Sequence, residues 1–561
     1  MTDKSKRKKV KIRPGIPWGK NGKPLPENNQ EGGVHEEDQH DKASAQTTLN
    51  THEEQQSVKE ITLQELAELL QVTPDDISVS PGTSEDGSCC AVPHSGQENQ
   101  QSVVQLVKRS VNQHFPKPPA ELEKNLQQHL LEVETVVQTQ LERLASRITC
   151  KELMGCLLDC YHRQTIDHLH GLLQNISTPK NSFMLLNWVQ HTYLIIISRD
   201  LPAAASPQRV DHIKYVDLIL FTEWVTKAKD KLLENVQKDV RASLEEILQN
   251  ERSQEGGDSD EAFVQLNVDS IQCINAMYKS AETVSKTLSD RVQEVCFQEL
   301  LLFVKRYTNE QTEILRNQTQ KAEPDMKLFL KTLQNCEALK QHVQTKSNNS
   351  KTSLPEDTVK VLEEMKDVTM KLLLEIVAGY TESHLKSYFK SKNEHFSMLV
   401  DEVKMSFPKL MWCQDVQERV MDDVYKLITE LYFKHLVQSK QSKLKKCWSS
   451  DVWQKVTKDA ELLHSTISDM AFGVQKWNRM LLKITELLKC NDTDGLKLEV
   501  ASMQQMGITK REDLELLLRW KGLSKQQVRE VMEALPDHQP TPRPVSWYNS
   551  LMWRRLRSTE D

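Results

Sequence analysis

Apolar side chains recur every three or four residues over long stretches of the chain. Between residues 122 and 148 they follow one another in steps of 4, 4, 3, 4, 4, 3 and 4, at Leu122, Leu126, Leu130, Val133, Val137, Leu141, Leu144 and Ile148. This spacing marks one face of an α-helix and predicts an amphipathic helix of about eight turns. Similar stripes run over 232–247 and 416–431. Because no comparable run alternates strictly between apolar and polar residues, we predict an all-α fold.

Polar stretches containing Pro or Gly separate these stripes and suggest where the helices end. They lie at 201–207, 250–261, 346–355 and 407–408. Long helices joined by short polar segments favour antiparallel bundles, and no sequence repeat of fixed period is present. We therefore expect an elongated rod of stacked antiparallel bundles. The expected bundles cover 120–250, 260–405 and 408–535, and a Pro-rich tail follows at 536–561.

Residues 1–110 break the helical pattern. They are rich in Gly, Pro, Gln, Glu and Ser, and they hold too few apolar residues to offset the entropy lost on ordering. We expect this segment to form a disordered leader. One short helix is predicted within it at 62–72, where Thr62 and Glu65 fit a capping box ahead of a stripe of leucines.

The formal net charge of −7 hides a separation of charge within the leader. Residues 1–26, the basic tip, carry nine basic residues and one acidic residue, which gives +8. Residues 27–102, the acidic stem, carry sixteen acidic and two basic residues, which gives −14. The remaining chain is nearly neutral, so the charge points to the leader rather than to the helical body.

Composition and motifs argue against an enzyme. The chain has 17 Gly in 561 residues, well below the usual ~7%, and it contains none of the common phosphate-loop, nucleophile-elbow or zinc-protease motifs. We therefore expect no catalytic residues and no cofactor. The start of the chain has no apolar segment of the kind that secretory signals carry. The most apolar run, 183–197, is too short and too polar to span a membrane and predicts a buried core helix instead.

The cysteines and histidines provide one candidate metal site. Cys156 and Cys160 are four residues apart and would share a helix face, with His162, His168 and His170 close behind and Cys150 just ahead. Zinc would take two thiolates and two imidazoles from such a set. The usual zinc spacings are absent, and free cysteines commonly fill helical cores, so core packing is the favoured interpretation. We expect no metal. Eleven scattered cysteines without a Cys-x-x-Cys pair suit a reduced, cytoplasmic protein.

Two Leu-x-x-Leu-Leu patterns occur, at residues 66–70 and 514–518. Such a pattern can form an amphipathic helix that docks on a partner, but it also arises by chance in a Leu-rich helical chain. The first lies in the leader and is the better docking candidate. The second is expected to be core.

Three groups of basic residues are candidates for binding. The basic tip holds Lys4, Lys6, Arg7, Lys8, Lys9, Lys11 and Arg13, with Trp18 beyond them. Such a cluster can bind an anionic lipid surface, act as a nuclear localisation signal, or have no specific role. A second group comprises Lys440, Lys443, Lys445 and Lys446, for which a solvated helix face is the simpler interpretation. The tail interleaves arginines, from Arg543 to Arg557, with aromatic residues around Trp547 and Trp553, which suits either an interface or packing on the last bundle.

Two segments resemble motifs of the exocyst complex component 3 (Sec-six) family. Residues 185–193 resemble its helix with a Trp-x-Gln-x-x-Tyr-like core, and residues 513–524 resemble its C-terminal Leu-rich helix, which ends in a basic-Gly turn. The matching positions are Leu186, Trp188, Gln190, Tyr193, Leu517, Leu518, Lys521 and Gly522. Lys521 stands where an Arg is more usual. The resemblance runs over about residues 120–535.

The resemblance implies a rod of the tethering-complex type that acts without catalysis in exocytosis and vesicle tethering at the plasma membrane. It implies exocyst subunits and SNARE proteins as partners. A short branch of the family, with exocyst component 3-like proteins and tumour-necrosis-factor-alpha-induced protein 2 (M-Sec), implies instead membrane remodelling, a Ral GTPase partner and a phosphoinositide-binding basic N-terminus. The founding subunit's N-terminal coiled coil has no counterpart here except the 121–149 helix, so the short branch is the closer match.

A nuclear adaptor remains the alternative from a different class. It would use the basic tip as a nuclear signal and the leucine pattern at 66–70 as a docking helix. Nucleic acid is not an expected partner. The expected location is cytoplasmic and peripheral at the plasma membrane, without a transmembrane segment.

Overall fold

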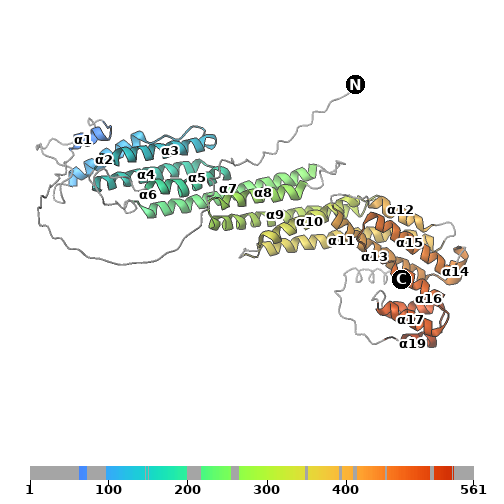
Figure 1. The fold of residues 1–561 in the computed structure, drawn as a ribbon. Helices are drawn as coiled ribbons and strands as arrows, with labels where there is room; N and C mark the ends of the chain where they lie inside the picture. The colour runs from blue at the N-terminus through green and yellow to red at the C-terminus, as the bar shows by residue number, and fades with distance from the viewer. Residues whose placement is uncertain are drawn as a thin grey trace, which may run out of the picture. The chain divides into compact units, whose positions relative to one another are not determined.

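The regular elements of the computed structural model are helices, as Figure 1 shows. The structure describes residues 62–72, 97–145, 147–148, 151–198, 216–253, 265–347, 352–390, 395–407, 413–448, 451–505, 511–533 and 535. The prediction of an all-α fold is confirmed for this part of the chain. The basic tip, most of the acidic stem and the tail at 536–561 lie outside the described residues.

The chain divides into two compact units, and two helices contribute to both. Unit 1 comprises residues 1–235 and 279–285, and unit 2 comprises 236–278 and 286–561. Helix α7 (Leu218–Ser253) contains the division between residues 235 and 236, and the last turn of α8 (Gln265–Glu282) belongs to unit 1. The division into three bundles that the sequence suggested stays a prediction.

Unit 1 is built around the leucine and valine stripe of helix α3. Its helices are α1 (Leu63–Leu69), α2 (Gln97–His114), α3 (Leu122–Ala145), α4 (Lys151–Asn175), α5 (Pro179–Trp188), the π-helical turn η2 (Val189–Tyr193), α6 (Leu194–Ser198) and the start of α7. Each residue of the predicted stripe from Leu122 to Ile148 is buried. Helix α4 packs against α2 and α3, and α5 packs against α3.

Helix α2 corrects the expected extent of the disordered leader. Residues 97–110, which were expected to belong to the leader, form most of this helix. Leu106, Val107 and Val111 of α2 are at most 1% exposed, and α2 packs against α4. The polar composition of this stretch concealed the helix, because only one narrow face of α2 contributes to the core.

Unit 2 holds the remaining helices. They are α8 (Gln265–Glu282), α9 (Lys286–Gln318), α10 (Met326–Lys346), α11 (Leu354–Tyr388), α12 (Phe396–Ser406), α13 (Gln414–Gln438), α14 (Gln441–Cys447), α15 (Val452–Met470), α16 (Arg479–Lys489), α17 (Thr493–Gln505), α18 (Arg511–Lys521) and α19 (Lys525–Glu533). Helix α11 packs against α9, α10 and α13, and α15 packs against α16. The predicted stripe at 416–431 is buried along α13.

A buried carboxylate joins three helices of unit 2. Asp459 of α15 accepts hydrogen bonds from the hydroxyls of Tyr388 and Tyr432, which come from α11 and α13. Lys455 places its ammonium 3.2 Å from the same carboxylate. Burial raises the pKa of Asp459, and these three partners act in the opposite direction. The carboxylate is thus satisfied by its neighbours, as a buried polar group must be.

Candidate interaction surfaces

The first family-like motif forms a buried aromatic cluster at a π-helical turn. Trp188 ends α5 and Tyr193 ends η2, and their rings stack with centroids 5.8 Å apart. Leu186 and Tyr193 are 1% exposed, whereas Gln190 is only partly buried. An α-helix places residues five apart on different sides, but the wider π turn brings these two rings onto one face. The sequence pattern predicts a single helix here, and the π turn within it was not predicted.

A histidine fixes the orientation of Tyr193. His162 Nε2 lies 3.2 Å from the carbonyl oxygen of Asp217, which can only accept, so Nε2 carries the proton. Nδ1 therefore accepts a hydrogen bond from the Tyr193 hydroxyl, at 2.9 Å. Burial lowers the pKa of His162 and raises that of Tyr193. Both side chains are neutral, and both ring nitrogens of His162 are hydrogen-bonded, which suits a structural role.

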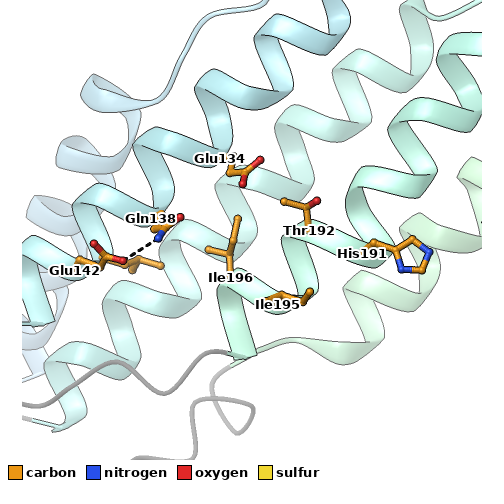
Figure 2. A pocket seen from close by; sticks show the side chains of 8 residues that line it. Glu134, Gln138, Glu142, His191, Thr192, Ile195 and Ile196 are labelled. Atoms are coloured by element: carbon orange, nitrogen blue, oxygen red, sulfur yellow. Dashed lines mark hydrogen bonds between the residues drawn. The ribbon is translucent and has the colours of Figure 1, made fainter. Parts of the chain in front are cut away.

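A shallow groove lies beside this motif (Figure 2). Its volume is about 280 Å³, and its lining residues come from α3 and from the η2–α6 segment: Glu134, Gln138, Leu141, Glu142, His191, Thr192, Ile195 and Ile196. Gln138 donates a hydrogen bond of 2.9 Å to Glu142, and the Trp188 indole points to Glu134 at 3.4 Å. Ile195 is 61% exposed. The groove combines the apolar side chains of Leu141, Ile195 and Ile196 with two carboxylates and the imidazole of His191.

The second family-like motif ends helix α18 in a Schellman turn. The Gly522 N–H donates to Arg519 O, and the Leu523 N–H donates to Leu518 O. Gly522 has φ of +103°, in the region that only glycine adopts without strain. Leu517 and Leu518 are fully buried. The positive φ at this position explains why the motif has a glycine there.

Lys521 of the same motif binds the end of a different helix. Its ammonium donates to the carbonyl oxygens of Leu487, Leu488 and Cys490, at 3.0, 2.9 and 2.6 Å. These carbonyls belong to the C-terminal end of α16, where the helix leaves them without partners and where a cation is favoured. Burial lowers the pKa of Lys521. The basic residue of the motif is therefore a cap between helices.

The second basic group forms an exposed lysine cluster on and beside α14. Lys440 is the N-cap residue, and Lys443, Lys445 and Lys446 follow on the helix. All four side chains are exposed, and no acidic residue lies between Glu430 and Asp451. Burial lowers the pKa of His435 to about 4, and the positive charges of Lys434, Lys390 and Lys386 act in the same direction, against Glu382.

Buried aromatic side chains hold the lysine cluster in place. Leu444 is fully buried on the inner face of α14, and Trp448 directly after the helix is 6% exposed. The Trp448 ring stacks on Tyr388 with centroids 5.3 Å apart. The lysines are therefore presented by a segment anchored to the aromatic core of unit 2.

The candidate zinc ligands do not converge. His162 is bound to Tyr193 and Asp217, as described above, whereas His168 Nε2 lies 2.7 Å from His129 Nε2. Cys156 and Cys160 are hydrogen-bonded to each other. Cys150 lies outside the described residues, and within those residues no three His, Cys, Asp or Glu side chains are grouped as metal ligands. The buried His129–His168 pair was not predicted, because the two residues are 39 positions apart.

Both Leu-x-x-Leu-Leu patterns are turned inward. Leu66 and Leu70 of the first, and Leu514, Leu517 and Leu518 of the second, are completely buried. The second pattern is core, as expected. The first was the better docking candidate of the two, but its leucines are not displayed, because helix α1 packs on the chain itself.

Among the described residues, no helix combines the length and hydropathy that a membrane span requires. The basic-tip candidates, Lys4 to Arg13, and the aromatic residues of the tail lie outside the described residues. The surfaces that the structure does describe are thus the groove of Figure 2 and the α14 lysine cluster.

Comparisons with known proteins place the fold. No protein-family model and no curated protein matches the sequence. The structure is similar to the crystal structure of M-Sec, with a TM-score of 0.55 and 17% identity, and the match covers 80% of each chain. A circular tandem repeat protein of novel repeat topology also aligns, covering 84% of this chain and 96% of its own at 15% identity, with a TM-score of only 0.15.

The M-Sec likeness extends over most of the helical body and defines the class of fold. The chain is an all-helical protein, and M-Sec is a solved structure whose fold it resembles.

Proposed function

We propose that this protein is a non-catalytic helical scaffold that acts at the plasma membrane, in vesicle tethering or in membrane remodelling of the M-Sec kind. The single observation that supports this proposal most is the likeness to M-Sec over 80% of the chain. The exposed α14 lysine cluster adds a surface suited to an acidic partner. The proposed partners are exocyst subunits, SNARE proteins, a Ral GTPase and an anionic phosphoinositide-containing membrane.

In this proposal the basic tip and the lysine cluster supply membrane contact, and the helical body supplies faces for protein partners. Each Lys or Arg near an anionic surface contributes about 1 kcal/mol of attraction. Several such residues together give binding that weakens as salt screens the charges. The docking helix of the nuclear-adaptor alternative has Leu66 and Leu70 buried in this structure, which does not favour that alternative.

Vesicle sedimentation tests the membrane contact. The full chain is mixed with vesicles of neutral lipid, with or without a phosphoinositide. We expect sedimentation only with the phosphoinositide, and less of it as salt is raised. Replacing Lys6, Arg7, Lys8 and Lys9 by Gln should reduce it strongly, and replacing Lys440, Lys443, Lys445 and Lys446 by Gln should reduce it further.

A matched variant controls for net charge. Lys238, Lys305, Lys360 and Lys404 are also exposed but are spread over α7, α9, α11 and α12, and replacing them by Gln removes the same charge. We expect this variant to sediment like the unaltered chain. Equal sedimentation with and without phosphoinositide would refute the lipid role.

Affinity purification tests the protein partners separately. The tagged full chain should retain exocyst subunits, SNARE proteins and a Ral GTPase, the last more strongly in its GTP-bound form. Absence of all three from the retained fraction would count against the scaffold proposal even if lipid binding persisted.

A further inference from the structure

Helix α1 is an amphipathic helix pressed against the rest of unit 1. It has only seven residues, and the capping box predicted from sequence is formed: the Glu65 N–H donates to Thr62 Oγ1 at 3.2 Å, and the Thr62 N–H donates to Glu65 Oε2 at 2.9 Å. Leu66 and Leu70 are completely buried and Ala67 is 2% exposed, whereas the opposite face is polar and exposed. The inner face of α1 thus reads Leu-Ala-x-x-Leu.

The carbonyl end of α1 is bound by two side chains from other helices. Ser110 of α2 donates from its hydroxyl to Leu70 O at 2.8 Å. Arg143 of α3 donates from Nη1 to Leu69 O, also at 2.8 Å. These donors satisfy carbonyls that a helix leaves without intrahelical partners. Ser110 and Arg143 therefore bind the C-terminal end of a short helix whose apolar side is buried.

The side chain of Arg143 is oriented for this contact by a residue of its own helix. Gln140 accepts two hydrogen bonds from the Arg143 guanidinium, from Nε at 3.0 Å and from Nη2 at 2.8 Å. This leaves Nη1 directed at α1. Because Gln140 and Arg143 both belong to α3, the clamp does not depend on α1 for its orientation.

The features of α1 itself favour exchange. A helix of seven residues has little stability of its own, since isolated helices shorter than ~12 residues are marginal in water. Its C-terminal turn, closed by the Val72 N–H to Ala67 O bond, places Gln71 at φ of +57°, in a conformation that glycine would adopt without strain. The hydrogen bonds from Ser110 of α2 and Arg143 of α3 thus hold a helix that has little stability of its own and that ends in a residue with an unfavourable φ.

We propose that the face of α2 and α3 beneath α1 is a docking site for an amphipathic helix of a partner protein, and that α1 is its built-in competitor. The partner helix would carry Leu at positions i and i+4 with a small residue at i+1, and it would end where Ser110 and Arg143 can bind its last carbonyls. This is recognition of a helix in a groove. Because α1 is on the same chain, it competes at a high effective concentration, and the partner binds well only when α1 leaves.

A peptide of residues 60–74, labelled with fluorescein, serves as the probe for this face. It is titrated against the full chain and against the double variant Leu66→Ala/Leu70→Ala, and binding is followed by fluorescence anisotropy. We expect the double variant to bind the peptide at least tenfold more tightly than the unaltered chain, because its own α1 no longer competes. A peptide with the same two alanines should bind neither.

Matched variants test the contacts that define the face. Gln64→Ala/Glu68→Ala changes only exposed residues of α1 and should behave like the unaltered chain. Adding Arg143→Ala to the double variant should weaken peptide binding severalfold, because the clamp on the carbonyl end is lost. Equal binding by the unaltered chain and a folded double variant would overturn the proposal.

A cleavable chain keeps the proposal testable if the double variant does not fold. A protease site is placed between α1 and α2, at residues 80–86, and the cut chain is diluted and passed over a gel-filtration column. We expect the fragment carrying α1 to separate from the body, and the labelled peptide then to bind the body. Retention of the fragment at nanomolar concentration, or a dimer that exchanges α1 between two copies, would refute α1 as an internal competitor.

Discussion

The same five-residue pattern occurs in two places in this molecule and is held in two different ways. Leu66 and Leu70 of α1 are completely buried, and so are Leu514 and Leu518 of α18. Helix α18, however, packs against α13 and α19, and its Trp520 indole binds Ser439 O. Helix α1 has seven residues and is held at its end by Ser110 and Arg143.

Both helices end in a Schellman turn, but the residue at its positive-φ position differs. In α18 it is Gly522, which adopts the positive φ without strain. In α1 it is Gln71, whose side chain disfavours the positive φ that it adopts. A leucine pattern therefore predicts which face is buried, whereas the neighbouring helices and the residue at the helix end decide how firmly that face is held.

Truncating one leucine in each pattern should give the largest difference between the two helices in stability and in hydrogen-exchange protection. Leu518→Ala leaves a cavity in the core of unit 2 and should cost about 2–5 kcal/mol. Leu66→Ala should instead release α1 locally, because few other contacts depend on it. Hydrogen–deuterium exchange would show faster exchange through α18 and its neighbours in the first variant, and faster exchange only in α1 and adjoining backbone in the second.

An exposed leucine of α18 provides the control. Leu516 is 47% exposed, so Leu516→Ala should leave exchange nearly unchanged. Loss of protection throughout unit 1 in Leu66→Ala would contradict the expected contrast, because it would show that α1 unfolds together with the rest of that unit.

The sequence was sufficient to predict the helical class and the buried stripes. The three- and four-residue spacing from Leu122 to Ile148 located the core face of α3, and the Thr62–Glu65 pair located the start of α1. These features are local in sequence, so spacing and capping rules apply directly. The lysine cluster of α14 was also visible as a run without acidic residues.

Other features depend on contacts between distant residues and could not be predicted. The π turn between Trp188 and Tyr193 leaves no composition signal, and the clamp formed by Ser110 and Arg143 joins segments that lie about 40 and 74 positions from α1. Helix α2 was missed because its polar residues outnumber those that pack. For the groove of Figure 2, the apolar run at 183–197 indicated burial, yet Ile195 within it is exposed.

Removing the cation that caps α16 should have an intermediate effect. Lys521→Met keeps most of the side chain's length but loses three hydrogen bonds to carbonyls, so we expect a loss of about 1–2 kcal/mol in the stability of the α16–α18 region. The loss is moderate because burying the ammonium already carries a desolvation cost, as its lowered pKa indicates. Hydrogen exchange at the last turn of α16 would measure it.

Lys521→Arg provides the matched control for the cap. The guanidinium retains the charge and offers several donors, so we expect most of the protection of α16 to be recovered. Equal loss in the Arg and Met variants would show that side-chain packing, rather than hydrogen bonding to the α16 carbonyls, determines the role of this position.

Changing the positive-φ residue at the end of each helix should give the smallest effects on stability, and the two effects should have opposite signs. Gly522→Ala should destabilise α18 by about 1 kcal/mol, because a Cβ there meets no atom within 4 Å and only the positive φ is penalised. Gln71→Gly should stabilise docked α1 by up to about 1 kcal/mol, offset in part by the greater entropy of an unfolded glycine. Exchange protection of α1 should rise, and the peptide of residues 60–74 should bind the full chain more weakly. A drop in α1 protection in Gln71→Gly would show that the positive φ of Gln71 is not a strain that limits docking.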